Sequence, residues 1–445
     1  MPNRQAPMIE FGRAGLKSYG GSIYEELLSE LQGNRGVRVY EEMSRNDAVV
    51  GAILFTIRML IRQVTWTIEA FGDEKQDTDA VNFLRTCMDD MESSWEQTIG
   101  DVLSFLVYGW SLTEIVYKRR LGQNNDETLN SRHNDGKVGW RKLAIRAQES
   151  LYRWEYDSDG TLTAFVQNPP PDYVLRTIPS ERFLLFRTDS TKNNPEGVSI
   201  LRNSYRAWYF KKNIEEIEAI GIERDLAGLP VVYVPPDVLR GETDETRSTR
   251  AAFLTMLTNI RRDKQEGVMM PLAYDARGNK MYDLQLLSSG SARRQFDTNG
   301  TIERYSRQIA MTVLADFILI GHEQVGSFAL SADKTNLFVT ALRAWLDSIA
   351  QVFNRYAVPR LWTLNGWDTE RLPKLVYGQT EEPTLTELAD FVSKLANVNI
   401  LTPDTGLEEH LRRKADLPVE IKRSAGWVEE ALSRSGCDED DNGRK

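Results

Sequence analysis

The sequence predicts an α+β fold in which long helices alternate with strand-rich segments. Two apolar rows at helical spacing, one after Gly197 and one after Thr298, predict the first two long helices. Between Ser111 and Thr188, short apolar runs separated by turn residues predict strands. A chain of 445 residues allows two or three domains with a sizeable core.

The first part of the chain predicts an arm followed by mixed helices and strands. Residues 1–36 are rich in glycine and polar side chains, which is typical of an arm or a partly disordered segment. Within the β-rich region, Asp157-Ser158-Asp159-Gly160 predicts a hairpin turn, and the polar stretch 122–136 predicts a mobile loop. The remaining elements predicted here are a helix over Glu41–Ile61, a strand over Thr65–Phe71, and helices over Asp77–Met91 and Trp95–Tyr108.

A first long helix is predicted between Pro195 and Pro236. No proline interrupts the chain from Gly197 to Ala227, and Gly228 followed by Pro230 is a typical helix end. Its apolar flank consists of Val198, Leu201, Tyr205 and Trp208, followed after a phase shift by Ile214, Ile217 and Ile220. The charged residues expected to lie outside any single-domain core are Arg202, Arg206, Lys211, Lys212, Glu215, Glu216 and Glu223.

Two more helices follow an α/β insert. The insert, residues 235–290, predicts a helix over Thr246–Asp263 and strands over Val268–Pro271 and Met281–Leu287. The second long helix is predicted over Thr298–Ile320. A loop without regular pattern, His322–Ser331, separates it from a third helix over Asp333–Tyr356. Near the C-terminus we expect a strand over Leu375–Tyr377, short helices over Leu385–Ala396 and Leu407–Lys414, and an acidic tail.

At these positions the chain resembles the portal (head–tail connector) proteins of tailed bacteriophages. The resemblance rests on Asn194-Pro195-Glu196-Gly197-Val198-Ser199-Ile200-Leu201-Arg202 before the first helix and Gly228-Leu229-Pro230 after it. It rests also on Gln295-Phe296-Asp297-Thr298, on Ile309 to Phe317, and on Gly326 to Ser331 with Lys334-Thr335. It extends from about Met43 to about Leu417.

The resemblance implies a portal architecture: an α/β wing, a long-helix stem, a small α/β clip, a channel loop and a short helical crown. Its expected regions are an N-terminal arm (1–40), the first part of the wing (41–196), stem helix 1 (197–228), the clip (229–294), stem helix 2 (295–320), the channel or tunnel loop (321–333), a long helix with the wing return (334–380), and the crown-like region with an acidic tail (381–445).

The resemblance also implies partners. Subunits of this family close into a ring, usually of twelve, at one capsid vertex, and double-stranded DNA passes through it during packaging and ejection. The expected partners are further copies of the chain, the terminase large subunit, a head-completion or adaptor protein, and the major capsid and scaffolding proteins. We expect the chain in the virion, and in the host cytoplasm during assembly. The most apolar windows, Val49–Ile61 and Ile309–Ile320, are too short for a membrane span.

Three groups of residues are candidates for the functional surfaces. The candidates in the channel loop and at the start of the next helix are His322, Glu323, Gln324, Ser327, Phe328 and Lys334. On stem helix 2, Arg304 and Arg307 either touch DNA phosphate or, as we favour, pair with Asp297, Glu303 or a neighbouring subunit. In the clip, Arg261, Arg262 and Lys264 either dock a motor or adaptor or form a solvated face.

The charge and the motifs indicate a structural protein without cofactors. The formal net charge of −10 argues against tight DNA binding, which needs clustered Lys and Arg, but suits a conduit along which DNA slides. No phosphate-binding loop occurs, three histidines and two distant cysteines form no metal pattern, and Gly109-Trp110-Ser111-Leu112-Thr113 fails as a nucleophile elbow. Two alternatives stay open: a DNA-processing phage enzyme, such as a carboxylate/metal nuclease, and an unrelated α+β scaffold protein.

Overall fold

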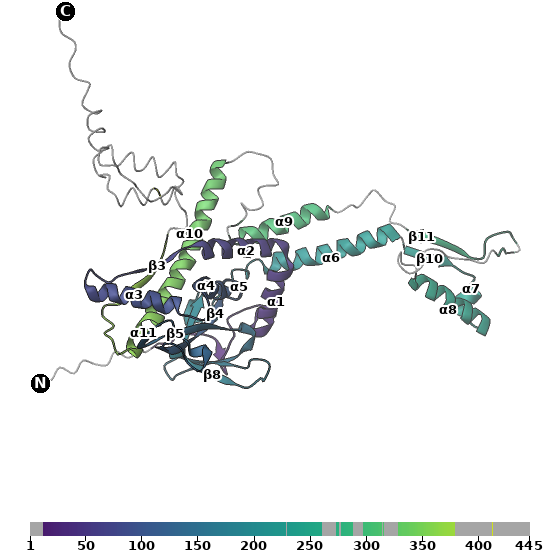
Figure 1. Cartoon of the computed structure of the whole chain (residues 1–445). Helices are drawn as coiled ribbons and strands as arrows, with labels where there is room; N and C mark the ends of the chain where they lie inside the picture. The colour runs from purple at the N-terminus through teal and green to yellow at the C-terminus, as the bar shows by residue number, and fades with distance from the viewer. Residues whose placement is uncertain are drawn as a thin grey trace, which may run out of the picture. The chain divides into compact units, whose positions relative to one another are not determined.

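The structure, a computed structural model, describes residues 12–227, 229–259, 273–275, 277–287, 297–313, 315, 328–378 and 412. The chain divides into two compact units, Met1–Gly378 and Gln379–Lys445, and the fold described here belongs to the first. It mixes helices and strands throughout, so the predicted α+β class is confirmed (Figure 1). The helices and the tail predicted after residue 380 lie outside the described residues, apart from residue 412.

The N-terminal helices differ from the prediction of one helix over Glu41–Ile61. The structure has two, α1 (Gly33–Asn46) and α2 (Ala48–Gln63), separated at Asp47. Asp47 is extended, and its carboxylate accepts hydrogen bonds from the N–H groups of Val49 and Val50 at 2.9 and 3.1 Å. An acidic side chain that satisfies these free N–H groups starts a new helix, which is why the pattern breaks here.

The segment before α1 is structured from residue 12 onward, where the sequence suggested an arm or partial disorder. It contains the hairpin β1 (Ser18–Tyr19) and β2 (Ser22–Ile23) and a short 3-10 helix, Ser29–Leu31. Ile23 and Leu31 are buried and join two different hydrophobic clusters. These two apolar anchors hold a polar segment against the body of the protein.

Two antiparallel sheets form the β-rich region. The first has the order β5–β4–β9, with β4 spanning Trp110–Leu121, β5 Asn134–Arg146 and β9 Phe183–Arg187. The second has the order β6–β7–β8, with β6 spanning Leu151–Tyr156, β7 Leu162–Gln167 and β8 Arg176–Pro179. The predicted β6–β7 turn is confirmed: Gly160 has a φ of +82°, and the Asp157 carboxylate accepts from the N–H of Thr161 at 2.8 Å.

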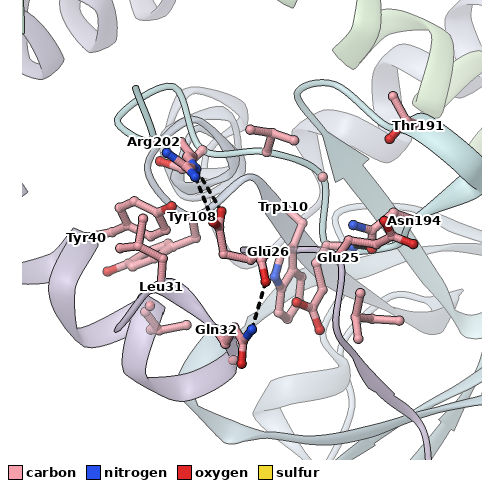
Figure 2. A pocket seen from close by; sticks show the side chains of 18 residues that line it. Glu25, Glu26, Leu31, Gln32, Tyr40, Tyr108, Trp110, Thr191, Asn194 and Arg202 are labelled. Atoms are coloured by element: carbon pink, nitrogen blue, oxygen red, sulfur yellow. Dashed lines mark hydrogen bonds and ion pairs between the residues drawn. The ribbon is translucent and has the colours of Figure 1, made fainter. Parts of the chain in front are cut away.

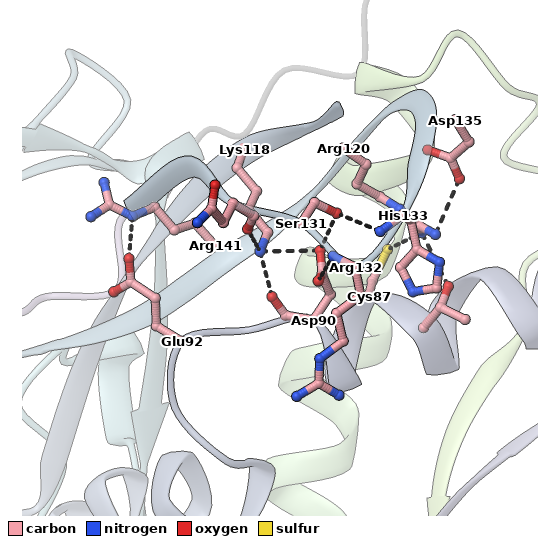
Figure 3. Close-up of polar contacts among 12 residues, drawn as sticks. Cys87, Asp90, Glu92, Lys118, Arg120, Ser131, Arg132, His133, Asp135 and Arg141 are labelled. Carbon is pink, nitrogen blue, oxygen red and sulfur yellow. Dashed lines mark hydrogen bonds and ion pairs between the residues drawn. The ribbon is translucent and has the colours of Figure 1, made fainter. Parts of the chain in front are cut away.

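The loop between β4 and β5 is tied to the body, which corrects the prediction of a mobile loop over residues 122–136. Asp90 accepts hydrogen bonds from Ser131 Oγ at 2.7 Å and from the Arg132 N–H at 2.8 Å (Figure 3). Lys118 donates to the carbonyls of Asp90 and Asn130 at 2.5 and 2.7 Å. Burial alone would raise the pKa of Asp90, but the hydrogen bonds from Arg132, Ser131 and Lys118 lower it overall.

The largest core lies between the first of these sheets and the helices around it. Those helices are α2, α3 (Lys75–Asp89), α4 (Trp95–Val102), α5 (Ser104–Tyr108), α10 (Phe328–Val352) and α11 (Val358–Leu364). The helix predicted over Trp95–Tyr108 is thus split in two at Leu103. In α10, Phe338, Leu342, Leu346 and Ile349 are at most 2% exposed, which places one helical stripe in the core.

The predicted return of the chain to the first part of the fold is confirmed. Strand β12 (Lys374–Tyr377) pairs antiparallel with β3 (Trp66–Glu69). Strand β3 lies within its predicted segment, and β12 begins one residue before the predicted strand. Asn354 braces β12, since its side chain donates to the Leu375 carbonyl and accepts from the Leu375 N–H, both at 2.8 Å. Asn354 lies in a π-helical turn, Phe353–Ala357, that joins α10 to α11.

The α/β insert between the first two long helices has two paired strands and two helices. Its elements are β10 (Leu229–Tyr233), α7 (Pro236–Arg240), α8 (Asp244–Asn259) and β11 (Asp283–Leu287), with β10 antiparallel to β11. Helix α8 and strand β11 match predicted elements, whereas α7, which begins with Pro236, was not predicted. Phe253 of α8 stacks on Tyr282 at 5.8 Å. The predicted strand Val268–Pro271 lies outside the described residues.

Two glycines allow the chain to cross itself just before the first long helix. Gly197 has a φ of +58°, and a Cβ built there would lie 2.3 Å from the Gly109 carbonyl oxygen. Gly109 has a φ of +89°, and its Cβ would lie 2.7 Å from the Glu196 carbonyl oxygen. The Asn194-Pro195-Glu196-Gly197 motif is therefore a close backbone crossing, which only glycine permits.

Replacing Gly197 with alanine should lower the free energy of unfolding by more than ~2 kcal/mol, because left-handed strain adds to a backbone clash. Gly160→Ala is the matched control: it also has a positive φ, but nothing lies within 4 Å of its Cβ, so only the strain of ~1–2 kcal/mol applies. Urea unfolding measures both. Equal losses for the two variants would contradict the crossing argument.

Candidate functional site

The candidate site is the pair of long helices α6 (Tyr205–Ala227) and α9 (Thr298–Met311), which lie side by side (Figure 1). They run antiparallel: Phe210 stacks on Tyr305 at 6.2 Å, while farther along α6 Glu218 accepts a hydrogen bond from Thr298. At the start of α6, Trp208 joins a buried cluster with Ile309 of α9 and with Met43 and Val50 of α1 and α2. The base of the pair is therefore packed on the N-terminal helices.

Both helices are shorter than predicted. Residues 201–204 form turns, so α6 begins at Tyr205 and not near Gly197. The Ser204 hydroxyl donates to the Leu201 carbonyl within these turns, and the Ser199 hydroxyl donates to the Val107 carbonyl of α5. Helix α9 ends at Met311, where the Thr312 hydroxyl donates to the Ile309 carbonyl at 2.7 Å. Residues 316–320 of the predicted second helix lie outside the described residues.

Lys211 is buried at the base of α6, which corrects the prediction that it belongs to an exposed charged flank. Its ammonium lies 2.8 Å from the Asp47 carboxylate, and the two side chains are 6% and 4% exposed. Asp47 thus caps α2 and neutralises Lys211 at the same time. A lysine this far inside a protein requires such a partner, since an unpaired buried charge is strongly unfavourable.

Two further ion pairs flank the buried one and are open to solvent. Lys212 lies 2.6 Å from Glu42 of α1, and Arg202 donates two hydrogen bonds of 2.8 Å to Glu26 (Figure 2). The hydrogen bond to Glu42 raises the pKa of Lys212. Burial opposes ionisation of Glu26, but Arg202 and the Leu28 N–H lower its pKa overall. Glu26, Glu42 and Asp47 therefore neutralise three bases. Arg202 lies just before α6, and Lys211 and Lys212 lie near its start.

The far side of α6 presents apolar side chains to solvent. Ile217 is 68% exposed, Ile220 48% and Tyr209 47%. Phe210, at 39%, lies at the edge of this side, because its ring also stacks on Tyr305 of α9. Trp208, by contrast, is 5% exposed and packs in the core. Helix α6 thus has one face that is buried and a second apolar face that no described part of the chain covers.

On α9, Arg304 and Arg307 point away from any core and already have contacts within the chain. Arg307 forms an ion pair with Glu303 at 3.3 Å, one of the pairings considered from the sequence, and both side chains are about half exposed. The Arg304 guanidinium lies 5.1 Å from the centre of the Tyr305 ring. Their contact with DNA or with a neighbouring subunit stays a prediction.

The other predicted site residues lie outside the side chains that the structure describes. His322, Glu323, Gln324 and Ser327 fall in this category, as do Arg261, Arg262 and Lys264. Phe328 and Lys334 lie in α10, where only their backbone is described. This helix starts five residues before the predicted one. The earlier start has a local reason, because Phe328-Ala329-Leu330-Ser331-Ala332 contains three good helix formers and no glycine or proline.

A cavity of about 210 Å³ beside these ion pairs was not predicted. Its lining includes Glu26, Tyr40 of α1 and Arg202 (Figure 2), together with Glu196. Burial raises the pKa of Glu196 to about 7, although the Trp154 indole N–H donates to it at 3.1 Å and partly offsets this effect. No local pattern marks Glu196, because its surroundings come from distant parts of the chain.

The described residues contain no group of three or more His, Cys, Asp or Glu side chains that could hold a metal ion. Among those same residues, no helix is both long and apolar enough to cross a membrane.

The family of the chain follows from a sequence comparison. The family described as the portal protein of Mu bacteriophage matches residues 37–416. The chain belongs to this portal protein family. The match includes α6, α9, the insert between them and both residues of the buried Asp47–Lys211 pair.

Several solved structures are similar to this chain at low sequence identity. A chain from the virion of a native gene transfer agent particle matches with a TM-score of 0.50 and 12% identity, covering 86% of this chain and 93% of that one. A chain from the neck of the native particle, computed with C12 symmetry, matches at 14% identity over 85% and 93% of the two chains, with a TM-score of 0.46. An HK97 family phage portal protein from Corynebacterium diphtheriae matches at 9% identity over 76% and 94%, with a TM-score of 0.41.

Removing either charge of the buried pair should destabilise the portal-family fold. Asp47→Asn keeps a good helix cap and loses the charge, and Lys211→Met leaves Asp47 unpaired; each should cost ~3–5 kcal/mol of unfolding free energy. The double variant should cost less than the sum of the two, because neither charge is then stranded. Chemical denaturation measures all three, with Glu155→Gln, which breaks an exposed pair with Arg153, as a control within ~1 kcal/mol of wild type. Additive losses would contradict direct pairing.

Glu196 should make stability depend on pH near neutrality. Its pKa is raised from 4.5 to about 7 in the folded chain, so the folded state binds the proton more tightly and stability falls as pH rises between these values. Glu196→Gln stays neutral and should flatten this decline. The stability of the variant minus that of wild type should therefore be larger above pH 7 than at pH 5. Melting temperatures across pH test this; parallel profiles for the two proteins would rule it out.

Proposed function

We propose that the chain is a portal subunit that forms a closed ring at one capsid vertex and conducts double-stranded DNA during packaging and ejection. The observation that carries the proposal is the portal-family match over residues 37–416. The fold shared with a gene transfer agent virion chain supports the same placement in a particle. The proposed sites of action are the virion and, during assembly, the host cytoplasm.

Ring closure is supported by the exposed apolar side of α6. Tyr209, Ile217 and Ile220 face solvent there, while other sides of the helix are packed on α9 and on the N-terminal helices. A ring requires head-to-tail contact between two different surfaces of identical chains. We place the apolar row Tyr209, Ile217 and Ile220 in that contact, with twelve copies as the expected number.

Transient DNA contact is supported by the charge distribution. Twelve copies would carry 12 × −10 = −120 formal charges, which disfavours tight binding of a polyanion. Arg307 is already paired with Glu303, which weakens any contact with phosphate. The proposed channel surface consists of Arg304, Arg307 and the channel-loop candidates named above.

Docking is assigned to the insert between α6 and α9, in keeping with the portal resemblance. Its basic residues Arg261, Arg262 and Lys264 are the proposed contacts for the terminase motor and later for head-completion or tail proteins. The nuclease alternative draws no support from the described residues, which hold no metal-binding cluster of acids and histidines.

The full-length chain should purify as a ring of about 12 × 50.8 ≈ 610 kDa, measured by native mass spectrometry. Ile217→Asp with Ile220→Asp should leave folded, smaller species, because charges would be buried in the contact. Ile217→Leu with Ile220→Leu is the control and should form rings. If wild type stays a monomer or dimer at all micromolar concentrations, also with the scaffolding protein present, the ring proposal is wrong.

DNA binding by the ring should be weak, independent of sequence and steeply reduced by salt, because it uses a few phosphate contacts per subunit. Filter binding across a salt series measures this, beside nuclease and ATPase assays. Lys334→Glu should alter packaging or ejection more than assembly. Tight sequence-specific binding, or metal-dependent cleavage lost on mutating one carboxylate, would favour the enzyme alternative.

A further inference from the structure

The loop that leads into α6 is held from outside by the N-terminal segment. We call residues Lys17–Gln32 the N-terminal strap and residues 188–204 the β9–α6 loop. Ile23 anchors one end of the strap among Trp110, Trp154 and Phe165, and Leu31 anchors the other among residues of α1 and the start of α6. The strap therefore bridges the second sheet and the helical base.

Two adjacent acids of the strap hold both ends of this loop. Glu25 lies 2.9 Å from Lys192, and Glu26 binds Arg202 through two hydrogen bonds of 2.8 Å (Figure 2). Lys192 has a φ of +54°, a conformation that a lysine adopts only when its surroundings impose it. The pairing with Glu25 is one such constraint.

The attachments of α6 differ in how deeply they are buried. The Asp47–Lys211 pair and Trp208 form the buried centre. Around it lie three solvent-exposed pairs, Glu25–Lys192, Glu26–Arg202 and Glu42–Lys212, whose side chains are 21–42% exposed. Salt screens the exposed pairs but hardly affects the buried one. The cavity of about 210 Å³ lies between the strap, α1 and the β9–α6 loop, so this rim is not tightly packed.

We infer that the base of α6 is a hinge: the buried Asp47–Lys211 contact is its pivot, and the three exposed pairs are latches that set the angle of α6. When the latches open, the strap and the β9–α6 loop separate, and α6 turns about the pivot without unfolding. A load on α6 reaches the body through this base, beside the packing of the end of α9 in the largest core. The latches would therefore govern how the long helices respond to that load.

The test is a distance measurement by pulsed EPR in the full-length chain. Spin labels at Asp159→Cys, in the β6–β7 turn, and Ala219→Cys, on the exposed side of α6, report the angle; Cys437→Ser removes the tail thiol, and Cys87 is buried. Labelled chains are diluted with unlabelled ones so that distances within one subunit dominate. At low salt the wild-type distribution should be narrow.

The latch variant, with Glu25→Gln, Glu26→Gln and Glu42→Gln, should show a clearly broader distribution of label-to-label distances at low salt, with unchanged amide protection in β4 and β5. The distance distribution of wild type should become nearly as broad near 1 M salt, where the screening length falls to ~3 Å. Glu155→Gln, which breaks the exposed Arg153 pair on β6, should stay narrow. A narrow distribution in the latch variant overturns the hinge. If that variant does not fold, the wild-type salt series decides, and a width independent of salt overturns it.

Discussion

The buried ion pair between Asp47 and Lys211 is the constraint on which the arrangement of this chain depends. Two charges can lie 2.8 Å apart inside a protein only if each keeps its partner, and the loss of one would cost a large part of the ~5–15 kcal/mol by which a domain is stable. Asp47 also begins α2. One carboxylate therefore fixes where α1 ends, where α2 starts and where α6 is attached.

This attachment explains how one chain can have both a stable body and a surface left for other copies. The aromatic and aliphatic cores hold the sheets and α10 together, and the ion-paired base holds α6 to them. Because α6 needs only its first turns and one side for this purpose, its other side is free to expose Ile217 and Ile220. In the proposed ring, that division would let subunits assemble after they have folded, and the net charge of −10 disfavours tight DNA binding.

The elements predicted well from the sequence are those set by local rules. The β6–β7 turn follows from Asp157 and Gly160, and β3 follows from the alternation of Trp66 and Ile68. The misjudged features depend on distant partners. Lys211 is 164 residues from Asp47, and Ser131, which ties down the supposed mobile loop, is 41 residues from Asp90. The start of α6 was placed too early because Val198 and Leu201 continue the helical spacing, although the crossing of Gly197 with Gly109 prevents a helix there.

The central claim is that α6 and α9 form the subunit contact and the channel of a ring, anchored through Asp47 and Lys211. A cryo-electron microscopy reconstruction of the purified full-length chain tests it most directly. The account predicts a closed ring in which Ile217 and Ile220 are covered by the neighbouring subunit while Asp47 stays paired with Lys211 within each chain. A ring in which these isoleucines face solvent, or particles without rotational closure, would contradict it.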